Sequence, residues 1–178
     1  LEQRYEIGRQ IPHELMHILL YHKLGGDAAP LPAWLDEGLA SNAERIVNPD
    51  YAWLLQDTYA RGELIPLDDL CPAFPRDAAG ALLAYAEAQS FTAYLHDQYG
   101  RSGIEALLNA YADGLACERA PQVALGKSLS QLERTWVQTQ LARSPWATLR
   151  EQYPYLLLFG LLIAIPLLVG WRYHPKAA

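Results

Sequence analysis

The sequence has few cysteines, and their arrangement excludes two kinds of site. Cys71 and Cys117 lie 46 positions apart, and no C-x-x-C pair occurs. Neither a cysteine-based zinc site nor a dithiol redox motif is therefore indicated. The two residues either form one disulfide, which would need an oxidising compartment, or remain two buried thiols. The sequence leaves this choice open.

Basic charge is also scarce. The chain has 14 Lys and Arg against 20 Asp and Glu, which gives a formal charge of −6, and no cluster of basic residues occurs. This argues against nucleic acid as a partner and offers no electrostatic attraction to anionic lipid. Hydrophobic residues make up 51% of the 178 residues, which is enough for one compact domain with a core of its own.

The N-terminus lacks both an initiator methionine and a signal peptide. The chain begins at Leu1, and only 12 residues precede His13, the first residue of the motif described next. We therefore expect the sequence to be a fragment or a processed piece of a longer protein.

The stretch 11–20 contains the pattern H-E-x-x-H, formed by His13, Glu14 and His17. On an α-helix, side chains four residues apart lie on the same face, so the two imidazoles can bind one metal ion. Glu14 follows the first histidine, and its carboxylate can accept a proton from a water bound there. The alternative is a pair of surface or core-edge histidines beside a solvated glutamate.

A proline interrupts the helix that residues 2–24 predict. Pro12 removes one backbone hydrogen bond and crowds the carbonyl of Gly8, so either the metal-binding helix begins near Pro12 or a longer helix kinks there. All residues of the stretch 15–20 except His17 are apolar, and we therefore expect this helix to be buried. Unpaired imidazoles and a carboxylate are costly in apolar surroundings, and a metal ion would remove that cost.

A third metal ligand is expected on the next helix. Catalytic zinc sites use three protein ligands and keep one position open for water. Glu37 lies 20 positions after His17, so a single loop can bring its carboxylate back to the histidines. Asp36 is the rival ligand, although its side chain is shorter. The alternative for Glu37 is an ordinary acid near the start of a helix.

H-E-x-x-H followed by W-L-x-E-G-x-A resembles the gluzincin metallopeptidases, the clan of thermolysin and the M1 aminopeptidases. The chain looks most like the bacterial peptidase MA-like domains, whose pattern L-P-x-W-L-x-E-G-L-A is similar to residues 31–40. The resemblance implies one Zn²⁺ per chain, with His13, His17 and Glu37 as ligands and Glu14 as the general base.

Two departures from the family patterns concern this site. The M1 enzymes have 18 residues between the second histidine and the glutamate, whereas 19 residues separate His17 from Glu37. In thermolysin-like enzymes an aspartate four residues after the ligand glutamate orients a ligand histidine, and here that position is Ser41. The partner that orients the histidines is therefore not identified by the resemblance.

A tyrosine on a later helix carries a second resemblance. The sequence predicts a long helix over 81–99, and Tyr85 is followed by Tyr94 at the spacing of the corresponding M1 helix, with Ala88 in place of the family's glycine. The resemblance implies that Tyr85 donates a hydrogen bond to the oxyanion of the reaction. The alternative is an ordinary packed tyrosine. His96 lies about three turns further along and is too distant to serve the same metal.

We predict a mainly α-helical, gluzincin-type catalytic subdomain over residues 1–144, with the family's preceding sheet supplied by sequence upstream. Residues 145–154 are expected to be a linker and 172–178 a short polar tail. The run 155–171 has no charged residue and carries aromatics at both ends, which predicts a short transmembrane helix. A buried core helix or a short hairpin insertion is the alternative.

Together these patterns predict a membrane-anchored zinc metallopeptidase that acts on a peptide or protein substrate. The charges beside the run 155–171 do not decide its orientation, but the resemblance implies a single-pass protein of the bacterial cell membrane with an extracytoplasmic catalytic domain. The alternative function is a non-catalytic, gluzincin-like membrane module that binds a partner or a ligand.

Overall fold

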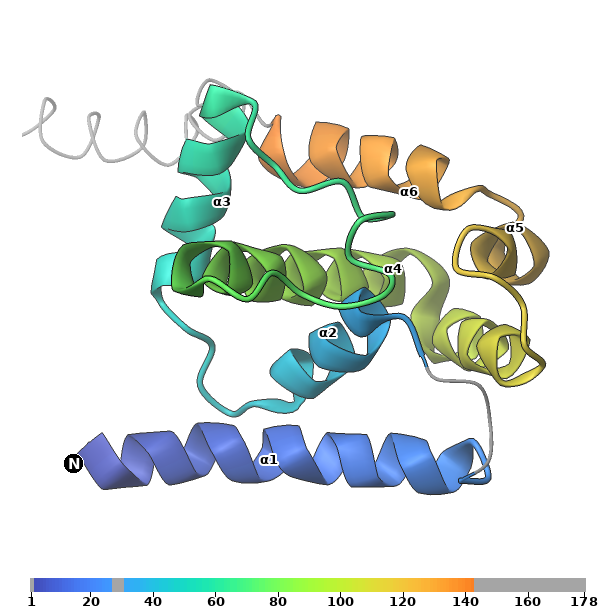
Figure 1. The fold of residues 1–178 in the computed structure, drawn as a ribbon, viewed down its shortest axis with the longest axis horizontal. Coiled ribbons are helices and arrows are strands. Elements are labelled where there is room, and N and C mark those ends of the chain that lie inside the picture. The colour runs from blue at the N-terminus through green and yellow to red at the C-terminus, as the bar shows by residue number, and fades with distance from the viewer. Residues whose placement is uncertain (1, 27–30, 143–178) are drawn as a thin grey trace, which may run out of the picture. The chain divides into compact units, whose positions relative to one another are not determined.

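The computed structural model describes residues 2–26 and 31–142, and every regular element in these ranges is helical (Figure 1). The prediction of a mainly α-helical domain is therefore confirmed for this part of the chain. Residues Leu1–Leu141 form one compact unit and Ala142–Ala178 a second. The predicted linker, transmembrane helix and polar tail lie outside the described residues. Within the described ranges, no helix combines the length and the apolar character that crossing a membrane requires.

Seven helical elements follow one another along the described chain. They are α1 (Glu2–Lys23), α2 (Ala33–Ala43), α3 (Asp50–Arg61), α4 (Ala78–Ala112), α5 (Arg119–Leu125), α6 (Leu129–Trp136) and the π-helical η1 (Val137–Leu141). The long α4 leaves helical geometry at Gly100, where φ is 64° and ψ is −172°. The first part of α4 thus ends where the predicted helix over 81–99 ends, because glycine adopts a positive φ without steric cost.

The central element is α4, with α2 packed on one side of it and α6 on another (Figure 1). Gly38 lets α2 approach closely, since a Cβ at that position would lie 2.5 Å from the carbonyl oxygen of Ala88. Three aromatic side chains fill the core beside this contact. The Phe91 ring lies 5.1 Å from the ring of Trp34 and 5.7 Å from that of Trp136, measured between centroids. This packing fixes the place of α2 against α4, and α1 packs on α2 in turn.

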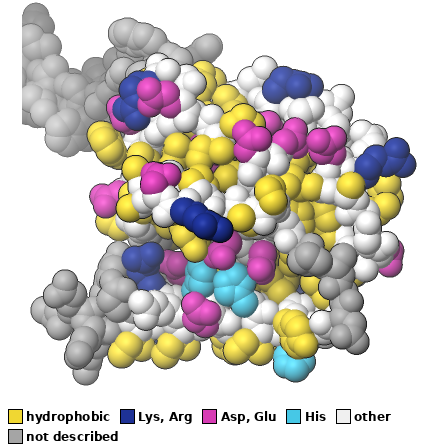
Figure 2. Space-filling view, in the orientation of Figure 1, with side chains coloured by type: hydrophobic (Ala, Val, Ile, Leu, Met, Phe, Trp, Pro, Cys, Tyr) yellow, Lys and Arg dark blue, Asp and Glu magenta, His cyan; other side chains and the backbone are white. Residues whose placement is uncertain are grey.

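The helix α1 runs unbroken through Pro12, so the metal-binding helix does not begin there. The expectation that this helix is buried is wrong for one of its faces. Five large aliphatic side chains on α1 are at least 50% exposed, and Figure 2 shows apolar side chains along its outer edge. They are Ile7, Ile11, Leu15, Ile18 and Leu19. Only the opposite face packs against α2, because the described residues provide α1 with a partner on that side alone.

A disulfide joins Cys71 to Cys117, which decides between the two alternatives that the sequence left open. It connects the irregular segment between α3 and α4 to the segment that precedes α5. Two parts of the chain without regular secondary structure are thereby held together.

Candidate metal centre

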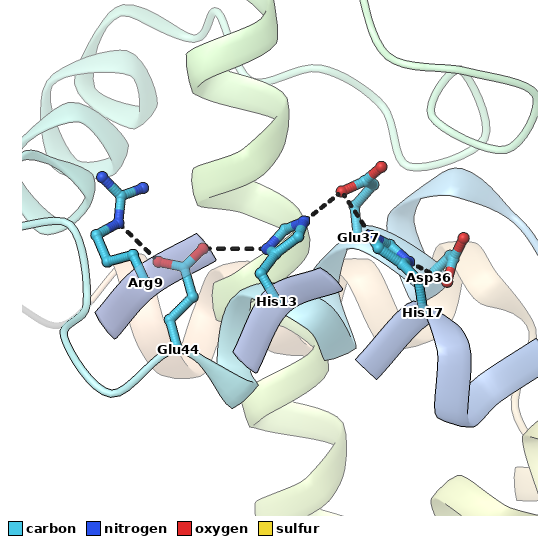
Figure 3. A network of polar contacts seen from close by, with 6 residues as sticks. All are labelled: Arg9, His13, His17, Asp36, Glu37 and Glu44. Carbon is cyan, nitrogen blue, oxygen red and sulfur yellow. Dashed lines mark hydrogen bonds and ion pairs between the residues drawn. The ribbon is translucent and has the colours of Figure 1, made fainter. Parts of the chain in front are cut away.

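Two histidines on α1 face a glutamate on α2 (Figure 3). One helical turn separates His13 from His17, and their ring centroids lie 5.0 Å apart. The Oε2 atom of Glu37 lies 3.2 Å from Nε2 of His13 and 3.7 Å from Nε2 of His17. One potential ligand atom from each of these three residues lies within 4.8 Å of the other two. The structure therefore brings together the three residues expected from the sequence to hold a metal ion.

Each imidazole meets a second carboxylate at its other nitrogen. Oε1 of Glu44 lies 3.1 Å from Nδ1 of His13, and Oδ1 of Asp36 lies 2.9 Å from Nδ1 of His17. An ionised carboxylate can only accept a hydrogen bond, so Nδ1–H is the donor in both contacts. In the neutral imidazoles this leaves the lone pair of each Nε2 directed towards the side of Glu37.

With both imidazoles neutral, the two Nε2 atoms and Oε2 of Glu37, which converge on the centre of the site, are all acceptors. Oε2 of Glu37 is buried and makes no hydrogen bond within the described part of the chain, although both histidines lie close to it. Such an arrangement is unfavourable unless a cation stands between the acceptors. A proton on one Nε2 would give Glu37 a single hydrogen-bond donor and would leave the other imidazole without a partner. A metal ion can bind all three groups at once. Two imidazoles and one carboxylate are a donor set of catalytic zinc sites, so these residues fit a zinc ion.

The orienting partner of His13 is Glu44, a residue that our reading of the sequence missed. It follows α2 directly, with φ −59° and ψ 135°, and its side chain returns towards α1. The other oxygen, Oε2, accepts a hydrogen bond from Nε of Arg9 at 2.9 Å, and the side chain is only 7% exposed. Ser41 does not take this role, because its Oγ is buried without a hydrogen-bond partner among the described residues. The sequence did contain a signal for this partner, since Glu44 follows Glu37 by seven residues, which is about two helical turns.

Asp36, the rival for the third ligand, lies outside the group of three potential ligands. Its carboxylate faces Nδ1 of His17, on the side of the ring away from Nε2. Neighbouring acids on α2 thus reach different atoms. Glu37 faces the centre of the site, and Asp36 orients one of the histidines.

Tyr85 lies at the edge of the same site. Its ring centroid is 6.3 Å from that of His13, and the ring packs edge-on against Phe74 at 5.0 Å. Burial, followed by the negative charge of Glu37 and the hydrogen bond between the two side chains, raises the pKa of the Tyr85 phenol to about 12. The phenol therefore keeps its proton at neutral pH and can donate a hydrogen bond.

Glu14 stands on the open side of the site, where its side chain is exposed. Together with His13 and Tyr85 it lines a cavity of about 200 Å³. The other residues around this cavity are Arg9, Gln10, Glu44 and Tyr51. His96 is 64% exposed and pairs with its neighbour Asp97, so it takes no part in the group. The arrangement places a carboxylate and a protonated phenol beside His13, around one cavity.

Comparison with known proteins adds one finding. A family model described as the peptidase MA superfamily matches residues 5–142. The match runs from α1 to the end of η1 and contains every residue of the site. Neither a curated protein nor a solved structure shows significant similarity to the chain.

Proposed function

This chain belongs to the peptidase MA superfamily, and from this premise we propose that it is a zinc-dependent metallopeptidase of the gluzincin type that hydrolyses peptide bonds. One observation carries the proposal. The lone pairs of two imidazoles and the unbonded Oε2 of Glu37 converge without a donor between them. Glu14 and Tyr85, which border the adjoining cavity, supply the remaining groups that peptide hydrolysis needs.

His13, His17 and Glu37 would hold the zinc ion. When bound, zinc supplies a Lewis acid that polarises the scissile carbonyl and lowers the pKa of water in the site. Glu14 accepts a proton from the attacking water and passes it to the leaving amine. The phenol of Tyr85 donates a hydrogen bond to the carbonyl oxygen as that oxygen becomes negative.

We also propose that the domain is held at the bacterial cell membrane by the run 155–171 and faces the outside. The uncharged, apolar sequence of this run supports an anchor. The disulfide between Cys71 and Cys117 supports an oxidising compartment for the catalytic domain. A fluorescent protein fused after Ala178 is expected to fluoresce in the cytoplasm. A C-terminal alkaline phosphatase that is active instead would place the tail outside and refute this orientation.

The deciding experiment compares the wild type with Glu14→Gln. We expect one zinc per chain in both proteins and cleavage of a mixed peptide library by the wild type alone, because the amide cannot act as a base. Glu118→Gln, which changes an exposed acid far along the chain, is the matched control and should keep full activity.

Each contrary outcome removes a separate part of the proposal. A folded wild type that takes up no zinc, even when zinc is supplied, would refute the metal centre. Zinc binding without cleavage of any peptide would favour a non-catalytic module. Full activity of Glu14→Gln would show that Glu14 is not the base.

A further inference from the structure

The helix that carries Asp36 and Glu37 begins without a side-chain cap. Pro32 occupies the N-cap position of α2, and its side chain cannot accept a hydrogen bond. Backbone carbonyls from a distant segment take over this role. The amide of Ala33 donates to the carbonyl of Cys71 at 3.0 Å, and the amide of Trp34 donates to that of Leu70 at 3.1 Å. The first two amides of the helix are thus satisfied by residues 70–71, here named the capping segment.

The disulfide holds this capping segment in place. Cys71 is bonded to Cys117, and Cys117 itself contacts the same first turn of α2. Its Sγ accepts a hydrogen bond from Nε1 of Trp34 at 3.4 Å, and its carbonyl accepts one from the hydroxyl of Tyr111 at 2.9 Å. Trp34 is fully buried. Both halves of the disulfide therefore touch the start of α2, one through its backbone and one through its sulfur.

The next residues along this turn belong to the candidate metal centre. Asp36 faces Nδ1 of His17 at 2.9 Å, and Glu37 lies 3.2 Å from Nε2 of His13. A metal site depends on how accurately its ligands and their partners are held, so a shift of this turn would move two of its carboxylates together.

We propose that the disulfide between Cys71 and Cys117 is a positioning element of the metal centre, and that its reduction weakens metal binding. The inference rests on the metal site put forward as part of the proposed function. Two small thiols, or one protein dithiol, would donate two electrons and two protons, become a disulfide themselves and leave Cys71 and Cys117 as thiols. Metal affinity would then follow the redox state of the surrounding thiols.

The test measures Zn²⁺ affinity of the full chain by competition with a chromophoric chelator. The wild type is compared with Cys71→Ser/Cys117→Ser and with wild type that has been reduced and alkylated. Reductant is removed before zinc is added, because thiol and phosphine reductants bind zinc. We expect affinity to fall about 10–100-fold in both modified proteins, the range found when partners of metal ligands are lost. Hydrogen exchange should show that the amides of Ala33 and Trp34 lose protection.

Leu132→Ala is the control for a general loss of stability. Leu132 is fully buried on α6 and takes part neither in the disulfide nor in the backbone hydrogen bonds between the capping segment and α2, so its truncation weakens the fold by another route. If Leu132→Ala and the double serine variant have the same melting temperature and lose zinc affinity by the same factor, the proposal is wrong. It is also wrong if a folded serine variant binds zinc within twofold of the wild type. A wild type that binds no zinc would instead refute the proposed function, which keeps the two failures distinct.

A second variant decides the matter if the serine variant does not fold. Trp34→Phe keeps the disulfide and an aromatic ring in the core but removes the donor that holds Sγ of Cys117. We expect about a threefold loss of zinc affinity, the equivalent of one weak hydrogen bond. Unchanged affinity in this variant would overturn the proposal.

Discussion

Replacing Glu44 by glutamine should weaken zinc binding although Glu44 contacts no metal in the proposed site. The carboxylate holds two donors at once, Nδ1 of His13 at 3.1 Å and Nε of Arg9 at 2.9 Å. Glutamine has nearly the same shape but only one acceptor oxygen, so it can satisfy one of these donors and not both. If its amide nitrogen faces His13, the imidazole must move its proton to Nε2, the atom that would bind zinc.

The expected magnitude follows from these two contacts. A hydrogen bond to a charged group contributes about 1.5–3 kcal/mol, and the substitution removes one such bond from a side chain that is 7% exposed. Since 1.4 kcal/mol is about tenfold in affinity, zinc should bind roughly 10–100-fold more weakly.

The assay is a competition titration with a chromophoric chelator at neutral pH. Glu63→Gln is the matched control, because it removes the same charge from an exposed pair with Arg61, far from the site in the sequence. Its zinc affinity should equal that of the wild type. If Glu44→Gln and Glu63→Gln bind zinc equally well, Glu44 does not orient His13, and the tautomer reasoning is wrong.

Four further substitutions test other parts of the structure. Tyr85→Phe should lower kcat about 100–1,000-fold with zinc content unchanged, because only the phenol donor is lost. If its steady-state kinetics match those of the wild type, Tyr85 contributes only packing. Burial raises the pKa of the Glu87 carboxyl from 4.5 to about 8, so the folded protein holds its proton longer than the unfolded chain does, and stability falls as pH rises through this interval. In urea unfolding, the free energy of unfolding of Glu87→Gln should therefore equal that of the wild type near pH 4. At pH 8 it should be higher by up to about 4 kcal/mol, at 1.4 kcal/mol per pKa unit. A difference between the two proteins that is the same at pH 4 and pH 8 would contradict this. Gly38→Ala should destabilise the fold by at least about 1–3 kcal/mol, because its Cβ would meet the carbonyl oxygen of Ala88 at 2.5 Å. Gly8→Ala, which meets nothing within 4 Å, should instead stabilise α1 by about 1 kcal/mol, and equal thermal shifts in the two glycine variants would count against the close packing.

Much of the helical architecture could be read from local sequence. The motif H-E-x-x-H predicted two imidazoles on one face of a helix, because four residues are close to one helical turn. Gly100 ended the predicted helix over 81–99 at the point where the backbone adopts a positive φ. These features depend on residues close together in the chain, and short-range rules describe them well.

Burial of α1 was the expectation that failed. The apolar residues of the stretch 15–20 predicted a covered helix, yet Leu15, Ile18 and Leu19 are at least 50% exposed. The sequence shows that one face of a helix is hydrophobic. Whether that face is covered depends on which other elements pack against it. In the described residues α2 covers only the face that carries the histidines.

The sequence by itself determined which side chains can reach a metal: His13 and His17 by helical spacing, and Glu37 by its return after one loop. Tertiary structure decided how those side chains are held. The pairing of Glu44 with His13, of Asp36 with His17 and of Cys71 with Cys117 joins residues 19–46 positions apart. Spacing along one helix cannot specify such pairs, because each depends on the angle and separation at which α1, α2 and the capping segment pack.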